Sequence, residues 1–176
     1  MKSLVMVAAS VLLLSACGYA VRPYDASPDN IAALKALDFR PLAVGAFESV
    51  PPGLKSINCH ISNTVSADPG FAAYVRAAFI DELSRGGRFD AASPRVLSGR
   101  LDVADFNSSI LLGKWVLALT LANARGETLA VSIKHPFTGN ISADKGCERS
   151  AAEFAPAVRA LIAETLRHPQ FAALVK

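Results

Sequence analysis

Residues 115–133, WVLALTLANARGETLAVSI, decide the fold, because they hold two alternating apolar runs separated by a short polar stretch. Large apolar side chains stand at every second position of both runs, which is typical of strands that bury one face. These positions are Trp115, Leu117, Leu119 and Leu121 in the first run and Leu129, Val131 and Ile133 in the second. The five connecting residues 123–127, NARGE, include a glycine and predict a hairpin turn.

Further strands are expected on the N-terminal side of this hairpin. Leu97, Leu101 and Val103 alternate with polar residues, so we expect them on the buried face of a third antiparallel strand. Residues 41–47 and 57–61 are two shorter apolar segments that can each form a strand. The sequence therefore predicts an antiparallel sheet of four to five strands.

The clearest helix signal is a row of apolar residues four positions apart, which predicts one buried helix face. The row consists of Phe71, Val75, Phe79 and Leu83. Asp68-Pro69 before it matches an N-cap followed by proline, and Gly86-Gly87 should end the helix.

A second main helix is expected near the C-terminal end of the sequence. Ser150 and Glu153 match a capping box, while Pro156 predicts a kinked first turn or a start near Ala155. Pro169 should end this helix, and a shorter helix is expected to begin after Ser27-Pro28. The fold class is therefore α+β, with two main helices packed on one face of the sheet.

The first residues are typical of an export signal. Met1-Lys2 supplies a positive start, and residues 4–14 are apolar except for Ser10. Eleven helical residues rise about 16 Å, which is too short for a hydrocarbon core of about 30 Å. A cleavable signal peptide over residues 1–16 is expected.

The five residues Leu14-Ser15-Ala16-Cys17-Gly18 resemble a bacterial lipobox. This resemblance implies cleavage before Cys17 and attachment of a diacylglycerol to its sulfur, with a further acyl chain such as palmitate on its amino group. Gly18 follows the cysteine where aspartate would resemble an inner-membrane retention signal. The expected location is the outer membrane, with the protein held by its lipid and facing the periplasm.

An acylated Cys17 leaves Cys59 and Cys147 as an even pair in an oxidising compartment, where a disulfide is the expected state. The alternative is a metal site built from Cys59, His60, His135 and Cys147, although no paired ligand spacing supports it.

Composition gives no electrostatic case for nucleic-acid binding. The formal net charge of the 176-residue chain is +3, and no run of lysine and arginine is present. The 52% hydrophobic content is enough for one substantial core. We expect a lead-in segment with a short helix over residues 17–40 and a single domain over residues 41–176.

Catalytic motifs are not found in the sequence. It contains neither a glycine-rich phosphate loop nor a G-x-S-x-G elbow, and its three histidines are far apart. Asp102 and Asp105 would face opposite sides of a strand unless a bulge intervened. We expect no enzyme activity, no catalytic residue and no cofactor.

Several segments also resemble small proteobacterial envelope lipoproteins of uncharacterised function. They are YVRAAFIDEL at residues 74–83, LSGRL at 97–101, GKW at 113–115, Cys147, and HPQF at 168–171. A lipid-anchored α+β body is also similar, at the level of fold, to auxiliary lipoproteins of envelope transport and assembly systems.

Three functions remain open at this stage. The first is a non-enzymatic envelope protein that serves as a binding or assembly module for a protein partner. The second is a carrier or sensor of an apolar small molecule held between helices and sheet, an idea that fails if Trp115, Phe71 and Phe79 fill that space. The third is a hydrolase, which would need serine, histidine and an acid to converge in space.

Overall fold

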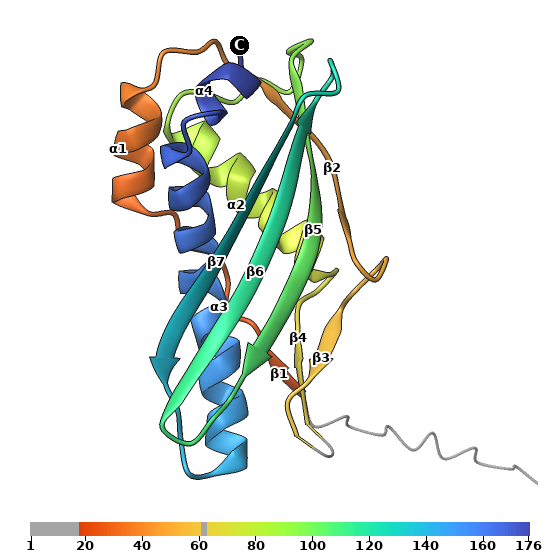
Figure 1. Ribbon diagram of the computed structural model, residues 1–176, viewed down its shortest axis with the longest axis vertical. Coiled ribbons are helices and arrows are strands. Elements are labelled where there is room, and N and C mark those ends of the chain that lie inside the picture. Colours follow the sequence, from red (N-terminus) through yellow and green to blue (C-terminus); the bar gives the residue numbers. More distant parts are fainter. Residues whose placement is uncertain (1–17, 61–62) are drawn as a thin grey trace, which may run out of the picture.

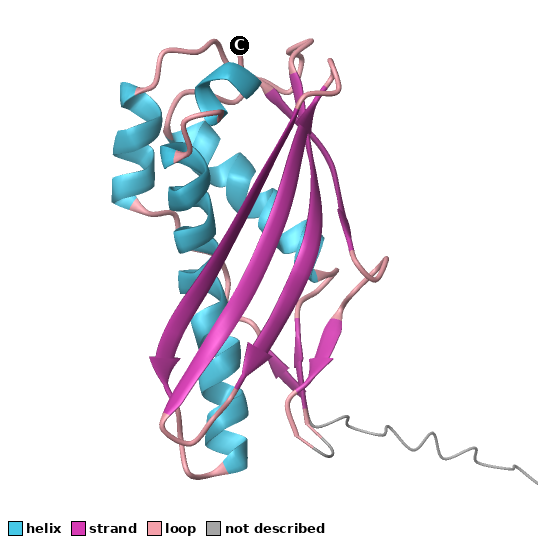
Figure 2. Cartoon of the chain, in the orientation of Figure 1, coloured by secondary structure: helices cyan, strands magenta, loops and turns pink. Residues whose placement is uncertain are grey.

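The computed structural model of the chain describes residues 18–60 and 63–176. Its elements are β1 (Gly18–Ala20), α1 (Pro28–Ala36), β2 (Ala43–Ser49), β3 (Ser56–Asn58), β4 (Thr64–Ser66), α2 (Phe71–Arg85), β5 (Val96–Asn107), β6 (Leu112–Asn123), β7 (Thr128–Thr138), α3 (Ala143–Arg167) and α4 (Phe171–Leu174). Figure 1 shows a long twisted sheet with the helices on one of its faces, and Figure 2 marks the same two layers. The α+β class and the one-sided helix layer agree with the prediction.

The main sheet has the strand order β2-β5-β6-β7. The predicted hairpin is present, because β6 pairs antiparallel with β7 and β5 pairs antiparallel with β6. β2, however, pairs parallel with β5, so the expectation of an entirely antiparallel sheet was wrong. The chain between these strands passes through α2, and such a helical crossover returns it to the sheet in the same direction.

A bulge between Leu101 and Val103 changes the alternation within β5. Asp102 is the extra residue, and beyond it the side chain of Val103 is exposed instead of buried as predicted. The bulge allows Asp102 and Asp105 to share the outward face, but both oxygens of Asp102 are engaged, by Arg100 and Thr120. This pair of acids therefore has no free Asp102 oxygen for acid–base chemistry.

β7 continues through Pro136, although proline has no backbone N–H to donate to the ladder; the register pairs Lys114 with Pro136 and Leu112 with Thr138. β7 is an edge strand, where a missing backbone donor is tolerated.

A second, three-stranded sheet has the order β1-β4-β3 and stands at the end of the main sheet where β5 finishes (Figure 1). β1 pairs parallel with β4, and β3 pairs antiparallel with β4. Thr64–Ser66, for which the sequence predicted no strand, form the central strand of this sheet. Ile61, at the end of the predicted strand over residues 57–61, lies outside the described residues.

α2 and α3 cover the sheet and build the core. Trp115 on β6 lies against Phe71 of α2 and Phe154 of α3, with ring centroids 6.0 and 4.8 Å away. All three side chains are fully buried. The predicted i, i+4 row of α2 is therefore a packing row, which stabilises the fold by about 1.5–3 kcal/mol per large side chain.

α3 begins well before the expected capping box at Ser150 and Glu153. Its N-cap is Ser142, and Ser150 is fully buried inside the helix with its hydroxyl donating to the Gly146 carbonyl. Residues 143–149 carry no apolar periodicity, so tertiary contacts stabilise these first turns of α3. The chief contact is the disulfide at Cys147. Pro156 does not end the helix: its cost of about 3 kcal/mol is offset by neighbours such as Phe154, which are fully buried.

The other helix ends follow the sequence more closely. Ser27 caps α1, its hydroxyl accepting from the Asn30 backbone N–H at 3.4 Å. α2 begins after Gly70 and not at the predicted Asp68-Pro69 cap, because the Phe71 backbone N–H donates to the Leu54 carbonyl instead. Beyond α3, Phe171, Leu174 and Val175 are buried in the core.

Within residues 18–60 and 63–176, no helix combines the length and apolar character needed to cross a bilayer.

Candidate functional site

The predicted site residues have different outcomes. Cys17, the expected lipid attachment site, and the signal segment before it lie outside the described residues. Cys59 and Cys147 form a disulfide with a Cα–Cα distance of 5.8 Å. The disulfide ties the small sheet to the first turns of α3, as the cysteine pairing predicted.

The alternative metal site is not assembled. Both cysteines are used by the disulfide, and among the described residues no three or more His, Cys, Asp or Glu side chains are placed to hold a metal ion. His135 Nε2 lies 3.2 Å from Glu153 Oε2 on α3. His168 is the C-cap of α3, and its Nδ1 accepts from the Gln170 backbone N–H.

Side chains fill the region between helices and sheet where an apolar ligand was considered. Trp115, Phe71 and Phe79 are all buried there, and Phe106 packs on Trp115 at 4.7 Å between centroids. The described residues therefore give no support to a ligand cavity between the two layers.

A buried polar cluster joins α1 to α2. Oε1 of Glu82 accepts from the Tyr24 hydroxyl at 2.6 Å, the Ser27 backbone N–H at 2.9 Å and Asn30 Nδ2 at 3.2 Å. Burial, and then the hydrogen bond to Glu82, raises the pKa of the Tyr24 phenol far above its usual range. Glu82 is fully buried, so this cluster has the character of a structural clamp on the lead-in segment.

The most promising binding feature is a pocket of about 140 Å³ at the end of the sheet where the β6–β7 turn meets the C-terminal residues. It is lined by Leu42, Pro94, Arg95, Val96, Leu97, Asn123, Ala124, Arg125, Leu174, Val175 and Lys176. The aliphatic members form an apolar lining, and Arg95, Arg125 and Lys176 add cationic groups. A pocket of this composition suits a group that is apolar at one end and carries a hydrogen-bond acceptor or negative charge at the other.

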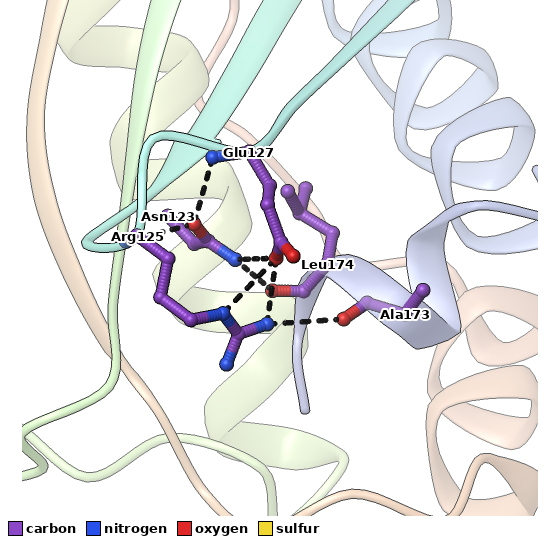
Figure 3. Close-up of polar contacts among 5 residues, drawn as sticks. All are labelled: Asn123, Arg125, Glu127, Ala173 and Leu174. Carbon is purple, nitrogen blue, oxygen red and sulfur yellow. Dashed lines mark hydrogen bonds and ion pairs between the residues drawn. The ribbon is translucent and has the colours of Figure 1, made fainter.

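Asn123 lines this pocket, and its polar contacts are drawn in Figure 3. Its Nδ2 donates to Glu127 Oε2 at 2.6 Å and to the Leu174 carbonyl at 3.0 Å. Its Oδ1 accepts from the backbone N–H groups of Arg125 and Glu127. One amide side chain thus fixes the hairpin turn and joins it to α4.

Arg125 also lines this pocket. Its guanidinium donates to Glu127 Oε2 at 2.6 Å and to the Ala173 carbonyl at 3.5 Å (Figure 3). The hydrogen bond from Arg125, followed by that from Asn123, holds the pKa of the Glu127 carboxyl below its usual range. The turn therefore presents a fixed ion pair at the mouth of the pocket.

Arg95 lies on the opposite strand end of the pocket. Its Nη2 donates to the Pro41 carbonyl at 3.4 Å, while its Nε is buried without a partner among the described residues. Buried donors are nearly always paired in folded proteins. Arg95 thus lines the pocket with a guanidinium that holds one unpaired buried donor.

Sequence reasoning identified residues 123–127 only as a turn and residues 171–175 only as an apolar tail. Their meeting depends on the path of the chain after α3, which no local pattern reports. The Asn-x-x-Gly-Glu turn was the visible signal, since asparagine side chains often bond to the backbone of their own turn.

No family model matches the chain, and no curated protein matches it at a significant level. Among solved structures, it is similar to the crystal structure of a Xanthomonas campestris protein assigned to DUF330, a family of unknown function. The two share 12% sequence identity with a TM-score of 0.57, over 89% of this chain and 96% of the other. At this identity the likeness establishes a shared fold.

Proposed function

We propose that this chain is a lipid-anchored envelope protein, held in the outer membrane through Cys17 and facing the periplasm, that serves as a non-enzymatic binding or assembly module for an envelope protein partner. The lipobox resemblance supports the anchor. The sequence contains no catalytic motif, and the described residues hold no group of three or more side chains that could bind a metal ion. Both observations are compatible with a binding role.

One spatial relationship carries the proposal: the residue after the expected anchor and the candidate pocket lie at opposite ends of the molecule. Gly18 begins β1 in the small sheet, whereas the pocket lies where β6 meets β7 (Figure 1). The 12-residue strand β6 separates these ends by about 40 Å. A body anchored at Gly18 would hold the pocket away from the membrane, where a periplasmic partner can reach it.

The partner chemistry follows from the pocket lining. An apolar side chain of the partner would contact Leu97, Leu174 and Val175, and a neighbouring carbonyl or carboxylate would accept from Arg95. Small, partly apolar pockets that also hold an arginine are typical anchor points of protein interfaces.

The test uses the full chain in a Gram-negative host. The mass of the mature protein and its membrane fractionation are measured for the wild type and for Cys17→Ala, which should lose the lipid and leave the membrane fraction. A mature protein that begins at Met1 without lipid would overturn the anchor.

A photoreactive amino acid at exposed Ala124 then reports on the partner, with exposed Ser132 in the middle of β7 as the control position. We expect a specific crosslink from position 124 that Arg95→Ala weakens, and none from position 132. Recovery of no partner from position 124 in intact envelopes would count against the binding module.

A further inference from the structure

Four large apolar side chains are exposed together at the end of the molecule opposite the pocket. Their exposed fractions are 58% for Ile110, 84% for Leu111, 64% for Leu112 and 85% for Ile141. Among the described residues only two other large apolar side chains are exposed, and neither reaches 55%. Such clustering of exposed apolar side chains marks an interaction surface.

These residues come from two loops that lie side by side. The Gly139 backbone N–H donates to the Leu111 carbonyl at 3.2 Å, and Leu112 is in register with Thr138. The loops approach so closely that a Cβ atom at Gly139 would lie 1.7 Å from the Ser109 carbonyl oxygen, so only glycine fits. Ile110, Leu111, Leu112 and Ile141 thus form one surface, the apolar tip.

Local hydrogen bonds hold the loops in this conformation. Asn107 Oδ1 accepts from the Ser109 backbone N–H at 2.7 Å, and Asn140 Oδ1 accepts from the Ser142 backbone N–H at 2.9 Å. Both are short Asx turns, which fix the backbone of each loop through local hydrogen bonds. The loops therefore keep this conformation without packing their apolar side chains into the core.

The apolar tip lies at the same end as the start of the described chain. Gly18 pairs with Thr64, which also pairs with Asn58 of β3. The next residue, Cys59, carries the sulfur that accepts from the Ser108 hydroxyl at 3.7 Å. Ser108 begins the loop of the apolar tip, and Figure 1 shows β1 and the β5–β6 loop at this common end.

A cationic groove of about 440 Å³ adjoins the apolar tip. It is lined by Arg22, Thr138, Gly139, Asn140, Lys145, Glu148, Arg149 and Ala152, so three cations face one carboxylate. Lys145 pairs with Glu148 on the surface, and such pairs exchange readily with other anions. Arg149 pairs with the largely buried Glu153, but its own side chain is exposed to solvent.

We propose that the apolar tip inserts into the phospholipid bilayer that holds the anchor, while the cationic groove lies at the level of the phosphate groups. This inference rests on the proposed lipid anchor, which would emerge beside the tip. Apolar side chains flanked by cations suit the boundary between acyl chains and anionic headgroups. The body would then stand upright on the membrane with its pocket outermost.

The test uses the full-length, processed protein reconstituted into vesicles of phosphatidylethanolamine and phosphatidylglycerol with brominated acyl chains, which quench indole fluorescence on contact. Leu111→Trp places a reporter on the tip, and Ala124→Trp, at an exposed position beside the pocket, is the matched control. The wild type supplies the background of the buried Trp115. Circular dichroism verifies that both variants are folded.

We expect strong quenching for Leu111→Trp and none beyond the background for Ala124→Trp. The quenching of Leu111→Trp should be weaker in vesicles in which phosphatidylcholine replaces phosphatidylglycerol, because the cationic groove then meets no anionic headgroups. An unquenched Leu111→Trp would overturn the proposal. The proposal would also be overturned if no quenching occurred and the protein formed a dimer that Leu111→Asp dissociates. That result would show that the apolar tip binds a second copy of the chain.

Failure of the anchor gives a different result. A protein whose mass lacks lipid and which does not float with vesicles overturns the proposed anchor. The tip is then tested by adding vesicles at high concentration to the same protein. Quenching of the Leu111→Trp reporter that an added Leu112→Asp weakens by about tenfold in lipid concentration supports the tip, and an absence of quenching overturns it.

Discussion

The phenol of Tyr24 donates a hydrogen bond of 2.6 Å to Oε1 of Glu82, a carboxylate that lies fully buried between α1 and α2. Fifty-eight residues separate the two in sequence. The contact fixes the lead-in segment on the body, so the position of Gly18 relative to the sheet depends partly on it.

Glu82→Ala should therefore destabilise the protein by about 2–4 kcal/mol, because the Tyr24 hydroxyl and the Asn30 amide would lose their acceptor. Urea unfolding measures the loss. Asp81→Ala is the matched control, since Asp81 pairs on the surface with Arg85 and its removal should cost at most about 1 kcal/mol. Equal losses in the two variants would contradict the clamp.

Two half-buried phenols make stability dependent on alkaline pH: Tyr24 of this cluster, and Tyr74, whose ring packs edge-on against Tyr24. Burial raises the pKa of Tyr74 to about 12, and the pKa of Tyr24 is raised further, whereas both phenols ionise near 10.0 when unfolded. Their contribution is complete below pH 10.0 and is lost as the pH rises through the folded values, because the unfolded state releases the protons first. Tyr24→Phe should flatten the fall of the urea midpoint above pH 10.0, and an unchanged slope would refute this.

Removal of the disulfide should loosen the end that carries the apolar tip. Cys59→Ser combined with Cys147→Ser opens a loop of 88 residues, for which the chain-entropy model gives about 4–5 kcal/mol. Unfolding under reducing and non-reducing conditions measures this in the wild type. The double variant should show no difference between the two conditions, and free thiols in the untreated wild-type body would count against the bond.

Trp115 should report on the centre of the core. Its Nε1 donates to the Ser150 carbonyl at 2.8 Å, so Trp115→Phe loses a buried hydrogen bond and some volume. We expect destabilisation of about 1–3 kcal/mol. The single tryptophan should resist quenching by iodide in the folded wild type, and ready quenching would show that this core is open to water.

Asn123→Ala should release α4 from the hairpin turn. The variant loses the bond to the Leu174 carbonyl together with those inside the turn, at a cost of about 1–2 kcal/mol. Hydrogen exchange of the Val175 amide should become faster. Asn140→Ala at the other end of the molecule should leave that exchange unchanged. Equally faster exchange of the Val175 amide in both variants would show that loss of the Asn123 contacts is not the cause.

Local signals in the sequence were sufficient for the elements whose stability is decided within one segment. The alternation in residues 115–133 predicted the β6–β7 hairpin, and the row from Phe71 to Leu83 predicted α2. The Ser27 cap and the cysteine pairing were also predicted correctly. The spacing of apolar residues, the turn residues and the number of cysteines can be read from the sequence without knowledge of the tertiary structure.

Contacts distant in sequence decided the rest. The early start of α3 depends on Cys147, which is fixed by Cys59, and the reversal of alternation after Asp102 arises from the register between β5 and β6. The parallel placement of β2 depends on the crossover through α2.

The sequence by itself determined the layers of this protein and the residues that fill its core, because burial of periodic apolar side chains leaves few alternatives. Only the tertiary structure decided which ends of the elements meet. It placed Asn123 against Leu174 at the pocket, and Gly139 beside Leu111 at the apolar tip. Exposed and polar residues show no periodic spacing from which their contacts could be predicted. Which of them meet is decided by the path of the chain and the register of the strands.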